Sequence, residues 1–142
     1  MSNAKSVKAK EGKINIEGKD YVIKFTMNSF IELEEEYGSI DEAMEAIKGI
    51  PVFDKDTKEP VMETVKDDET GKEIVQQKRR VSLKAIRKFL WVGLMTKQPE
   101  MKEEDIGNLL TLVNMTDVMK TIMETFGDSL PKDDTEGEDQ KN

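Results

Sequence analysis

The spacing of apolar residues changes once, near residue 26, and this change constrains the fold more than any other feature. Before it, apolar residues alternate with polar ones in two short runs, 13–17 and 20–26. After it, apolar residues recur at intervals of three and four as far as residue 126. Alternation predicts half-buried strands, whereas the longer spacing predicts amphipathic helices. The sequence therefore predicts an α+β fold that is mainly α, with an N-terminal β-hairpin.

The link between the two alternating runs supports the hairpin. Gly18-Lys19 separates them, and a two-residue link led by glycine is typical of a tight hairpin turn. The second run carries Tyr21, Ile23 and Phe25 on one face. Because an isolated hairpin is marginally stable in water, we expect this face to pack against helices.

Two helices are predicted directly after the hairpin. The first ends before Gly38, since glycine readily adopts the backbone conformation that closes a helix. The second begins with a capping box from Ser39 to Glu42 and ends before Gly49. Their apolar stripes, which should face the core, are Met27, Phe30, Ile31, Leu33 and Tyr37 in the first helix and Ile40, Ala43, Met44 and Ile47 in the second.

Three more helices are predicted between Ser82 and Gly127, which gives a bundle of about five short helices. Ser82 should cap the first of the three, which ends near Pro99, and Asn114 should cap the last. The residues predicted to form their apolar faces are Leu83, Ile86, Phe89, Leu90 and Leu94, then Ile106, Leu109, Leu110 and Val113, and finally Val118, Met119, Ile122 and Phe126.

Residues 51–80 interrupt the helical pattern with prolines, aspartates and a glycine. Within them, 61–65 and 73–77 favour two paired strands across a turn at 66–72. A loop of this length is unusual inside a compact domain, so we expect a protruding hairpin or a mobile loop.

Both ends of the chain are polar. Residues 1–12 are predicted to form a flexible arm and residues 129–142 a disordered acidic tail, which leaves a single domain at 13–128 without internal repeats. Ser2-Asn3-Ala4 resembles the scar of a cleaved expression tag. The N-terminal residues hold no apolar stretch, so we expect no signal peptide.

Charge and residue types narrow the classes of function. The chain has 142 residues and a net charge of −8, and such a surface repels phosphate backbones. It contains neither cysteine nor histidine, which excludes thiolate chemistry and removes the commonest general base. No apolar run approaches the roughly 20 residues that span a bilayer. We therefore expect a cytoplasmic protein with no membrane partner, and the net charge disfavours nucleic acid as a partner.

Candidate metal and catalytic motifs fail on spacing. The acidic runs 54–56 and 67–71 are similar to calcium loops, but neither places glycine and glutamate where an EF-hand requires them. No glycine-rich phosphate loop occurs. The acidic runs 34–36 and 103–105 are typical of exposed helix faces. We expect no metal, no cofactor and no catalytic residue, and hence a protein that is not an enzyme.

Methionine is enriched in the C-terminal half, and methionine surfaces adapt to different partners. Trp91 lies among these residues and suits an aromatic anchor. Filling of the core is the alternative interpretation for the whole set and stays open. The predicted partner-binding residues are Trp91, Leu94, Met95, Met115, Met119 and Met123.

A cluster of cations is the second candidate surface. It could contact nucleic acid, pair with acids of the first helix, or bind an acidic partner. These three interpretations stay open. The basic patch comprises Lys78, Arg79, Arg80, Lys84, Arg87 and Lys88.

The order of the elements, together with a few residues, carries a family resemblance over about residues 13–130. A hairpin ends in Phe25-Thr26, a helix ends at Gly38, and the run from Leu90 to Leu94 reads Leu-Trp-Val-Gly-Leu. Pro99, Glu103-Glu104, Gly107 and Leu110 follow in order. This pattern resembles the tail assembly chaperones of long-tailed bacteriophages and their prophage relatives, although residues 51–80 depart from the compact members.

The resemblance implies a specific function. Such a chaperone binds the tape-measure protein non-covalently and keeps it soluble while tail-tube subunits polymerise. It also implies the tail-tube protein as a second partner, a homo-oligomer, a location in the host cytoplasm and absence from the mature virion. The alternative is a small acidic regulatory or adaptor protein that contacts nucleic acid through Lys78 to Lys88.

Overall fold

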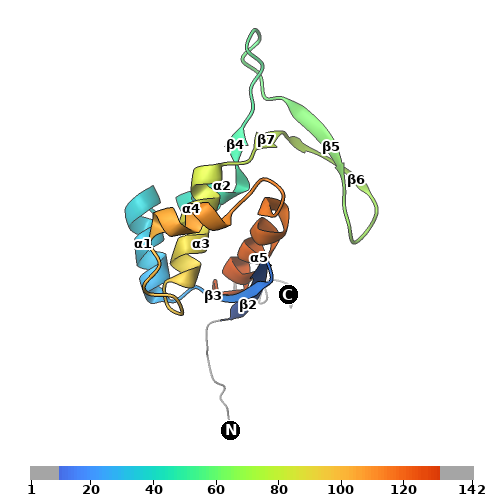
Figure 1. Ribbon diagram of the computed structural model, residues 1–142. Coiled ribbons are helices and arrows are strands. Elements are labelled where there is room, and N and C mark those ends of the chain that lie inside the picture. The colour runs from blue at the N-terminus through green and yellow to red at the C-terminus, as the bar shows by residue number, and fades with distance from the viewer. Residues whose placement is uncertain (1–9, 132–142) are drawn as a thin grey trace, which may run out of the picture.

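The computed structural model describes residues 10–131 and has the predicted α+β, mainly α, architecture (Figure 1). The predicted tag scar and residues 132–142 of the predicted tail lie outside this range. The elements are β2 (Glu11–Ile16), β3 (Lys19–Lys24), α1 (Met27–Tyr37), α2 (Ile40–Lys48), β4 (Ile50–Pro51), β5 (Met62–Lys66), β6 (Glu73–Gln77), β7 (Arg79–Arg80), α3 (Leu83–Leu94), α4 (Glu103–Leu109) and α5 (Met115–Asp128).

The N-terminal hairpin packs on the helices, as predicted. β2 and β3 are antiparallel, and β3 contacts α3 while β2 contacts α5. Tyr21, Ile23 and Phe25 are buried. The strand β2 begins at Glu11, so the prediction of a flexible arm as far as residue 12 was wrong. Gly12 explains the difference, because its missing side chain lets Thr125 of α5 approach the strand.

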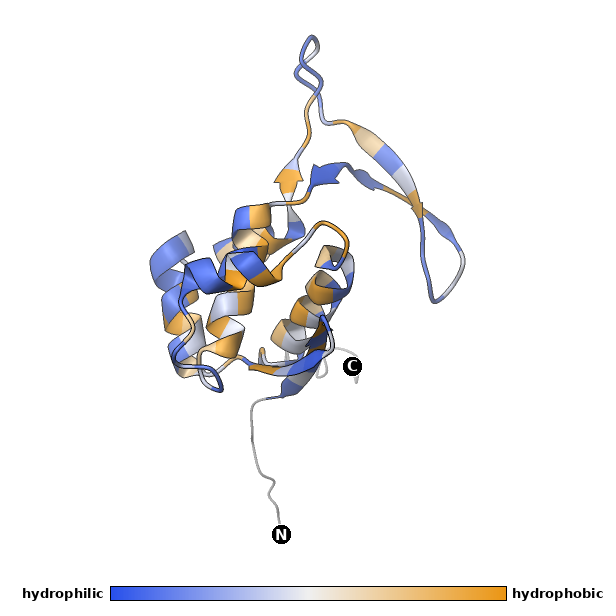
Figure 2. Ribbon diagram, viewed as in Figure 1, coloured by the Kyte–Doolittle hydropathy of each residue, from blue (hydrophilic) through white to orange (hydrophobic). Residues whose placement is uncertain are grey.

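An aromatic cluster forms the centre of the core. The ring centroids of Phe89 and Phe126 lie 5.1 Å apart at 75°, and those of Phe25 and Phe126 lie 5.3 Å apart at 82°. Such edge-to-face pairs are favourable beyond the area that they bury. Figure 2 shows α3 as the most hydrophobic helix and α1 as mainly hydrophilic. The cluster therefore ties the hairpin, α3 and α5 together.

The buried face of α1 differs from the predicted stripe. Met27 is 73% exposed and Ile31 is also exposed, whereas Ser29 is fully buried. The Ser29 hydroxyl donates to the Val92 carbonyl at 2.9 Å. A small, hydrogen-bonded side chain lets α1 approach the backbone of α3 closely, which turns Met27 and Ile31 towards solvent.

The connection between α4 and α5 also differs from the prediction. Val113, predicted to be buried, is 92% exposed, because α4 ends at Leu109 and Val113 lies in the following loop. Asn114 lies at the N-cap position of α5 as predicted, but its side chain makes no capping hydrogen bond to the helix. Its side-chain amide nitrogen donates to the Leu109 carbonyl, and its side-chain oxygen accepts from the Thr111 backbone amide. Ser39 and Ser82 cap α2 and α3 as predicted.

The C-terminal end of the domain extends past residue 128. The Ser129 hydroxyl donates to the Thr125 carbonyl at 2.7 Å, and Leu130 packs against the core. The prediction that the tail begins at residue 129 was therefore wrong, because an apolar side chain after the last helical turn still finds a partner in the core.

Residues 50–80 form a forked arm that projects from the helices (Figure 1). β4 and β7 pair as its stalk. Above them, Val52 donates to Lys78, Lys78 to Val61 and Val61 to Val52 through backbone groups at 2.7–3.0 Å. Two fingers leave this junction: a first finger at 53–60 and a ribbon at 62–77 made of β5 and β6. The ribbon agrees with the predicted strand pair to within one residue.

Both fingers end in the same six-residue turn. Sequence analysis predicted a turn at 66–72 but not its likeness to the turn at 54–59. The Asp54 carboxylate accepts from the amides of Asp56 and Thr57, and the Asp67 carboxylate accepts from those of Glu69 and Thr70. The hydrogen bonds from the Thr57 amide and, to a smaller extent, the Asp56 amide lower the pKa of Asp54. The fifth residue of each turn, Lys58 or Gly71, has a positive φ of 66° or 75°. Both turns begin with the sequence motif Asp-x-acid-Thr, whose first aspartate accepts the amide hydrogen bonds that close the turn.

Candidate protein-binding groove

A groove of about 470 Å³ lies between the N-terminal half of α3 and the region joining α4 to α5. Leu83 is 56% exposed at its edge, although it was predicted to be buried, and Leu112 is 75% exposed. Exposed leucines beside a concave surface are typical of a site for an apolar partner. The groove is lined by Leu83, Lys84, Ile86, Arg87, Gly107, Leu110, Thr111, Leu112 and Met115.

The loop after α4 has a defined shape that holds Leu112 outwards. Thr111 and Asn114 hydrogen-bond reciprocally, each backbone amide donating to the other side chain at 2.9 and 3.1 Å. The side-chain amide of Asn114 also donates to the Leu109 carbonyl at 3.1 Å. Leu112 is thus fixed by a closed polar turn. Because that turn is satisfied internally, the exposure of Leu112 does not result from a frayed helix end.

Ion pairs fix α4 as one wall of the groove. Lys88 of α3 lies 3.4 Å from Glu36 of α1 and 3.1 Å from Glu103 of α4. The Lys88 side chain is mostly buried, so these pairs are screened less than surface pairs. A single α3 cation therefore joins three helices.

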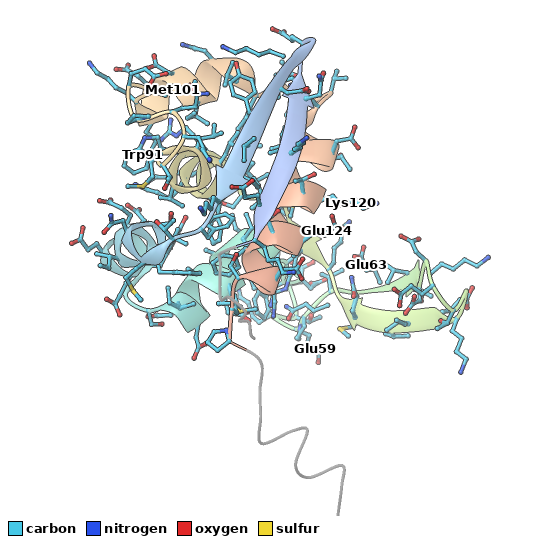
Figure 3. The ribbon with its side chains drawn as sticks, turned by 90° about the horizontal axis from the view of Figure 1, so that it is seen from below. Glu59, Glu63, Trp91, Met101, Lys120 and Glu124 are labelled. Atoms are coloured by element: carbon cyan, nitrogen blue, oxygen red, sulfur yellow. The ribbon has the colours of Figure 1, made fainter. Side chains whose placement is uncertain are left out.

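Trp91 strengthens the same wall. Its indole nitrogen donates to the Met101 carbonyl at 3.2 Å, and the Lys88 ammonium lies 5.0 Å from its ring. Figure 3 shows Trp91 beside Met101, away from Glu63 of the ribbon. Trp91 consequently holds the segment before α4 on α3, and its polar atom already has a partner.

Two cations lie along the α3 side of the groove. Lys84 is exposed. The Nε atom of Arg87 is 3.5 Å from Glu103 but has no hydrogen-bond partner within residues 10–131. A Cβ at Gly107 would be 3.4 Å from Arg87 Cδ, so the arginine stem lies against α4. The groove therefore combines apolar walls with a positive rim, and its guanidinium is incompletely hydrogen-bonded.

The pKa of Tyr37 is raised by burial and by two acids of this region, Glu36 and Glu103. Burial, and then the charges of Glu36 and Glu103, raise the pKa of Tyr37 from 10.0 to about 12. Both acids also pair with Lys88. The hydroxyl therefore stays protonated at neutral pH.

The structure separates the predicted partner-binding residues. Met115 lines the groove, whereas Met123 lies at a second, smaller pocket with Met44 and Phe126. Met95 and Met119 are half-buried against the core. Leu94 is fully buried, so its assignment to a binding surface was wrong. The glycine that follows Val92 explains this, because Gly93 lets the hairpin approach this part of α3 closely.

The predicted basic patch is divided among several partners. Arg79 pairs with Glu45 at 3.2 Å, and Glu45 has a lowered pKa because of Lys48 and then Arg79. Lys88 pairs with Glu36 of α1, which matches one of the three interpretations, whereas Arg87 pairs with Glu103 of α4 instead. The remaining cations are Lys78 and Arg80 in the arm and Lys84 at the groove.

Sequence reasoning missed Leu83, Gly107, Thr111 and Leu112 as groove residues. A signal was present in the run Leu109-Leu110-Thr111-Leu112-Val113, which holds more apolar residues than one helical face can bury. Among residues 10–131, no three acidic side chains meet in a group that could hold a metal ion. In the same range, no helix is long and apolar enough to cross a membrane.

Comparison of the chain with protein-family models, with curated proteins and with solved structures finds no match.

Proposed function

We propose that this protein is a non-catalytic tail assembly chaperone that holds an amphipathic helix of a tape-measure protein in the groove. The observation that carries the proposal is the apolar groove with Lys84 and Arg87 on one rim. It adds to the resemblance of residues 13–130 to that family.

The shape and chemistry of the groove suit a helical client. Helices bind grooves through apolar residues spaced three and four apart, and each fully buried leucine contributes about 1.5–3 kcal/mol. Leu83, Leu112 and Met115 provide the matching apolar surface. The two rim cations favour a client helix with acidic residues along one flank.

The rest of the surface suits a protein that keeps an apolar client in solution. The net charge is −8, and 37% of residues are charged. A complex with such a shell resists self-association. The proposal places the protein in the host cytoplasm and predicts that purified virions lack it, which mass spectrometry of virions would check.

Co-expression with the tape-measure protein tests the proposal. We expect the client to become soluble and to co-purify with the wild type, while Leu112→Asp abolishes this because it places a charge in the groove. Val113→Asp is the matched control, since Val113 is the adjacent exposed residue but does not line the groove. Full client solubility with Leu112→Asp would refute the proposed site.

A second variant separates the groove from the methionine stripe. Met123 lies at the smaller pocket, so the groove account expects Met123→Asp to bind the client normally. Loss of binding with Met123→Asp and not with Leu112→Asp would place the client on the stripe instead.

The alternative of an adaptor that contacts nucleic acid remains a proposal of its own. Within residues 10–131, Lys78, Arg80 and Lys84 form no ion pair, but Arg79, Arg87 and Lys88 each face an acid. Paired cations release fewer counterions on binding phosphate, which weakens this alternative. A gel shift with DNA or RNA at low salt would support it, and its absence would end it.

A further inference from the structure

The ribbon of the forked arm has two free edges. Within the described residues, β5 and β6 pair only with each other. The backbone amide of Asp67 donates to the Lys72 carbonyl at one end of the ribbon, and the backbone amide of Lys78 donates to the Val61 carbonyl at the other. Because bonded and non-bonded pairs alternate in an antiparallel ladder, the non-bonded residues point their backbone groups outwards. These residues are Met62, Thr64 and Lys66 on β5 and Glu73, Val75 and Gln77 on β6.

The two edges differ in how well they could accept another strand. The β5 edge includes Lys66, and an edge lysine discourages strand addition. The first finger also joins the start of β5, where Val61 donates to Val52 at 3.0 Å. In contrast, β6 carries four consecutive uncharged residues, 74–77, and Val75 is 65% exposed. The open edge is therefore that of β6.

We propose that β6 of one copy pairs antiparallel with β6 of a second copy, about a two-fold axis at Val75. In this register Val75 faces Val75 of the other copy, and Glu73 faces Gln77. No like charges oppose each other, and one strand serves both sides, as a two-fold interface requires. The pairing would form about six new backbone hydrogen bonds.

The charges of the core and the arm, and the projection of the arm from the helices, favour a second copy of the chain as the partner of β6. The chain as a whole has a net charge of −8, so two cores in close contact would repel. Residues 50–81 contain eight acidic and seven basic side chains, so the arm is nearly neutral. Because the arm projects away from the helices, pairing through the ribbon keeps the acidic cores apart (Figure 1).

The size of the contact sets its strength. Five residues a side bury much less than the roughly 1,600 Å² of a standard stable interface. The dimer should therefore form at high concentration and dissociate on dilution. This inference does not depend on the client, and either proposal can fail while the other stands.

Single-cysteine cross-linking tests the register, because the chain has no cysteine of its own. Facing bonded residues of antiparallel strands have Cα atoms about 5.5 Å apart, which suits a disulfide. We expect Val75→Cys to form a linked dimer on mild oxidation at least roughly tenfold faster than Thr64→Cys, because pairing raises the effective concentration. Thr64 is the matched control, since it faces Val75 across the ribbon and lies on the opposite edge.

Equal rates for the two variants, or faster linkage of Thr64→Cys, would overturn the proposal. Sedimentation of the unmodified chain over a range of concentrations gives a second test. We expect Val75→Lys to remain monomeric, because two lysines would meet at the axis, and Thr64→Lys to associate like the wild type. A wild type that is monomeric at every concentration, or a Val75→Lys variant that still dimerises, would refute the pairing.

Discussion

The helical core and the forked arm of this chain are stabilised by different means. The core buries eighteen apolar side chains around Phe25, Phe89 and Phe126. None of residues 50–80 is buried, and the arm is held by backbone hydrogen bonds and by the two aspartate turns. Burial of apolar area dominates folding, whereas an exposed hydrogen bond contributes little net free energy. The arm should therefore change without unfolding the core.

The two regions also present two different kinds of contact surface. The groove presents apolar side chains from α3, α5 and the loop after α4, which suits side-chain recognition of a helix. The ribbon presents backbone groups at an open edge, which suits strand addition. The proposed client site and the proposed self-association site are therefore separate surfaces, which variants can disrupt independently.

The largest expected effect contrasts two phenylalanines. Phe89→Ala should lower the free energy of unfolding by about 3–5 kcal/mol, because the fully buried ring leaves a cavity in the aromatic cluster. Phe53→Ala in the first finger should change it by less than about 0.5 kcal/mol, since Phe53 is exposed. Urea unfolding monitored by circular dichroism measures both. Equal losses would show that the arm is part of the cooperative core.

The next effect contrasts two glycines. Gly12→Ala should destabilise the protein by about 1–3 kcal/mol, since the new Cβ would collide with Thr125 and lie 3.1 Å from Thr121. Gly127→Ala meets nothing within 4 Å and should be neutral or slightly stabilising, because alanine favours a helix. Thermal unfolding of the two variants compares them directly. An unaffected Gly12→Ala would mean that α5 does not press on β2.

A smaller effect should stay within the arm. Asp67→Ala removes the carboxylate that caps the ribbon turn and should weaken it by about 1 kcal/mol, a typical value for a lost cap. Hydrogen exchange should speed up for amides of β5 and β6 only. Faster exchange in α3 or α5 would contradict the independence of the two regions.

The smallest effect is a pH dependence of the core. Because the pKa of Tyr37 is raised to about 12, its contribution is complete below the usual pKa of 10.0 and is lost as the pH rises through the folded value. The melting temperature of the wild type should fall more steeply across this window than that of Tyr37→Phe. Parallel pH profiles would contradict the raised pKa.

Sequence alone predicted the elements that local chemistry determines. The hairpin, the end of α1 at Gly38 and the serine caps of α2 and α3 all follow from residues close in the chain. Spacing of apolar residues identified most of the core, including Phe126.

The errors arose where a distant residue decides the outcome. Ser29 displaces Met27 from the core only because the Val92 carbonyl accepts its hydroxyl. Gly12 joins the sheet because α5 lies against it. Predicting the groove would have required the relative positions of α3, α4 and the following loop, and no local sequence pattern contains them.

An amide NMR titration of the full chain with a helical tape-measure fragment tests the central claim most directly. The account predicts chemical-shift changes clustered at residues 83–87 and 107–115, with the ribbon at 62–77 unchanged. Changes confined to the ribbon or to the surroundings of Met123, with the groove unaffected, would contradict it.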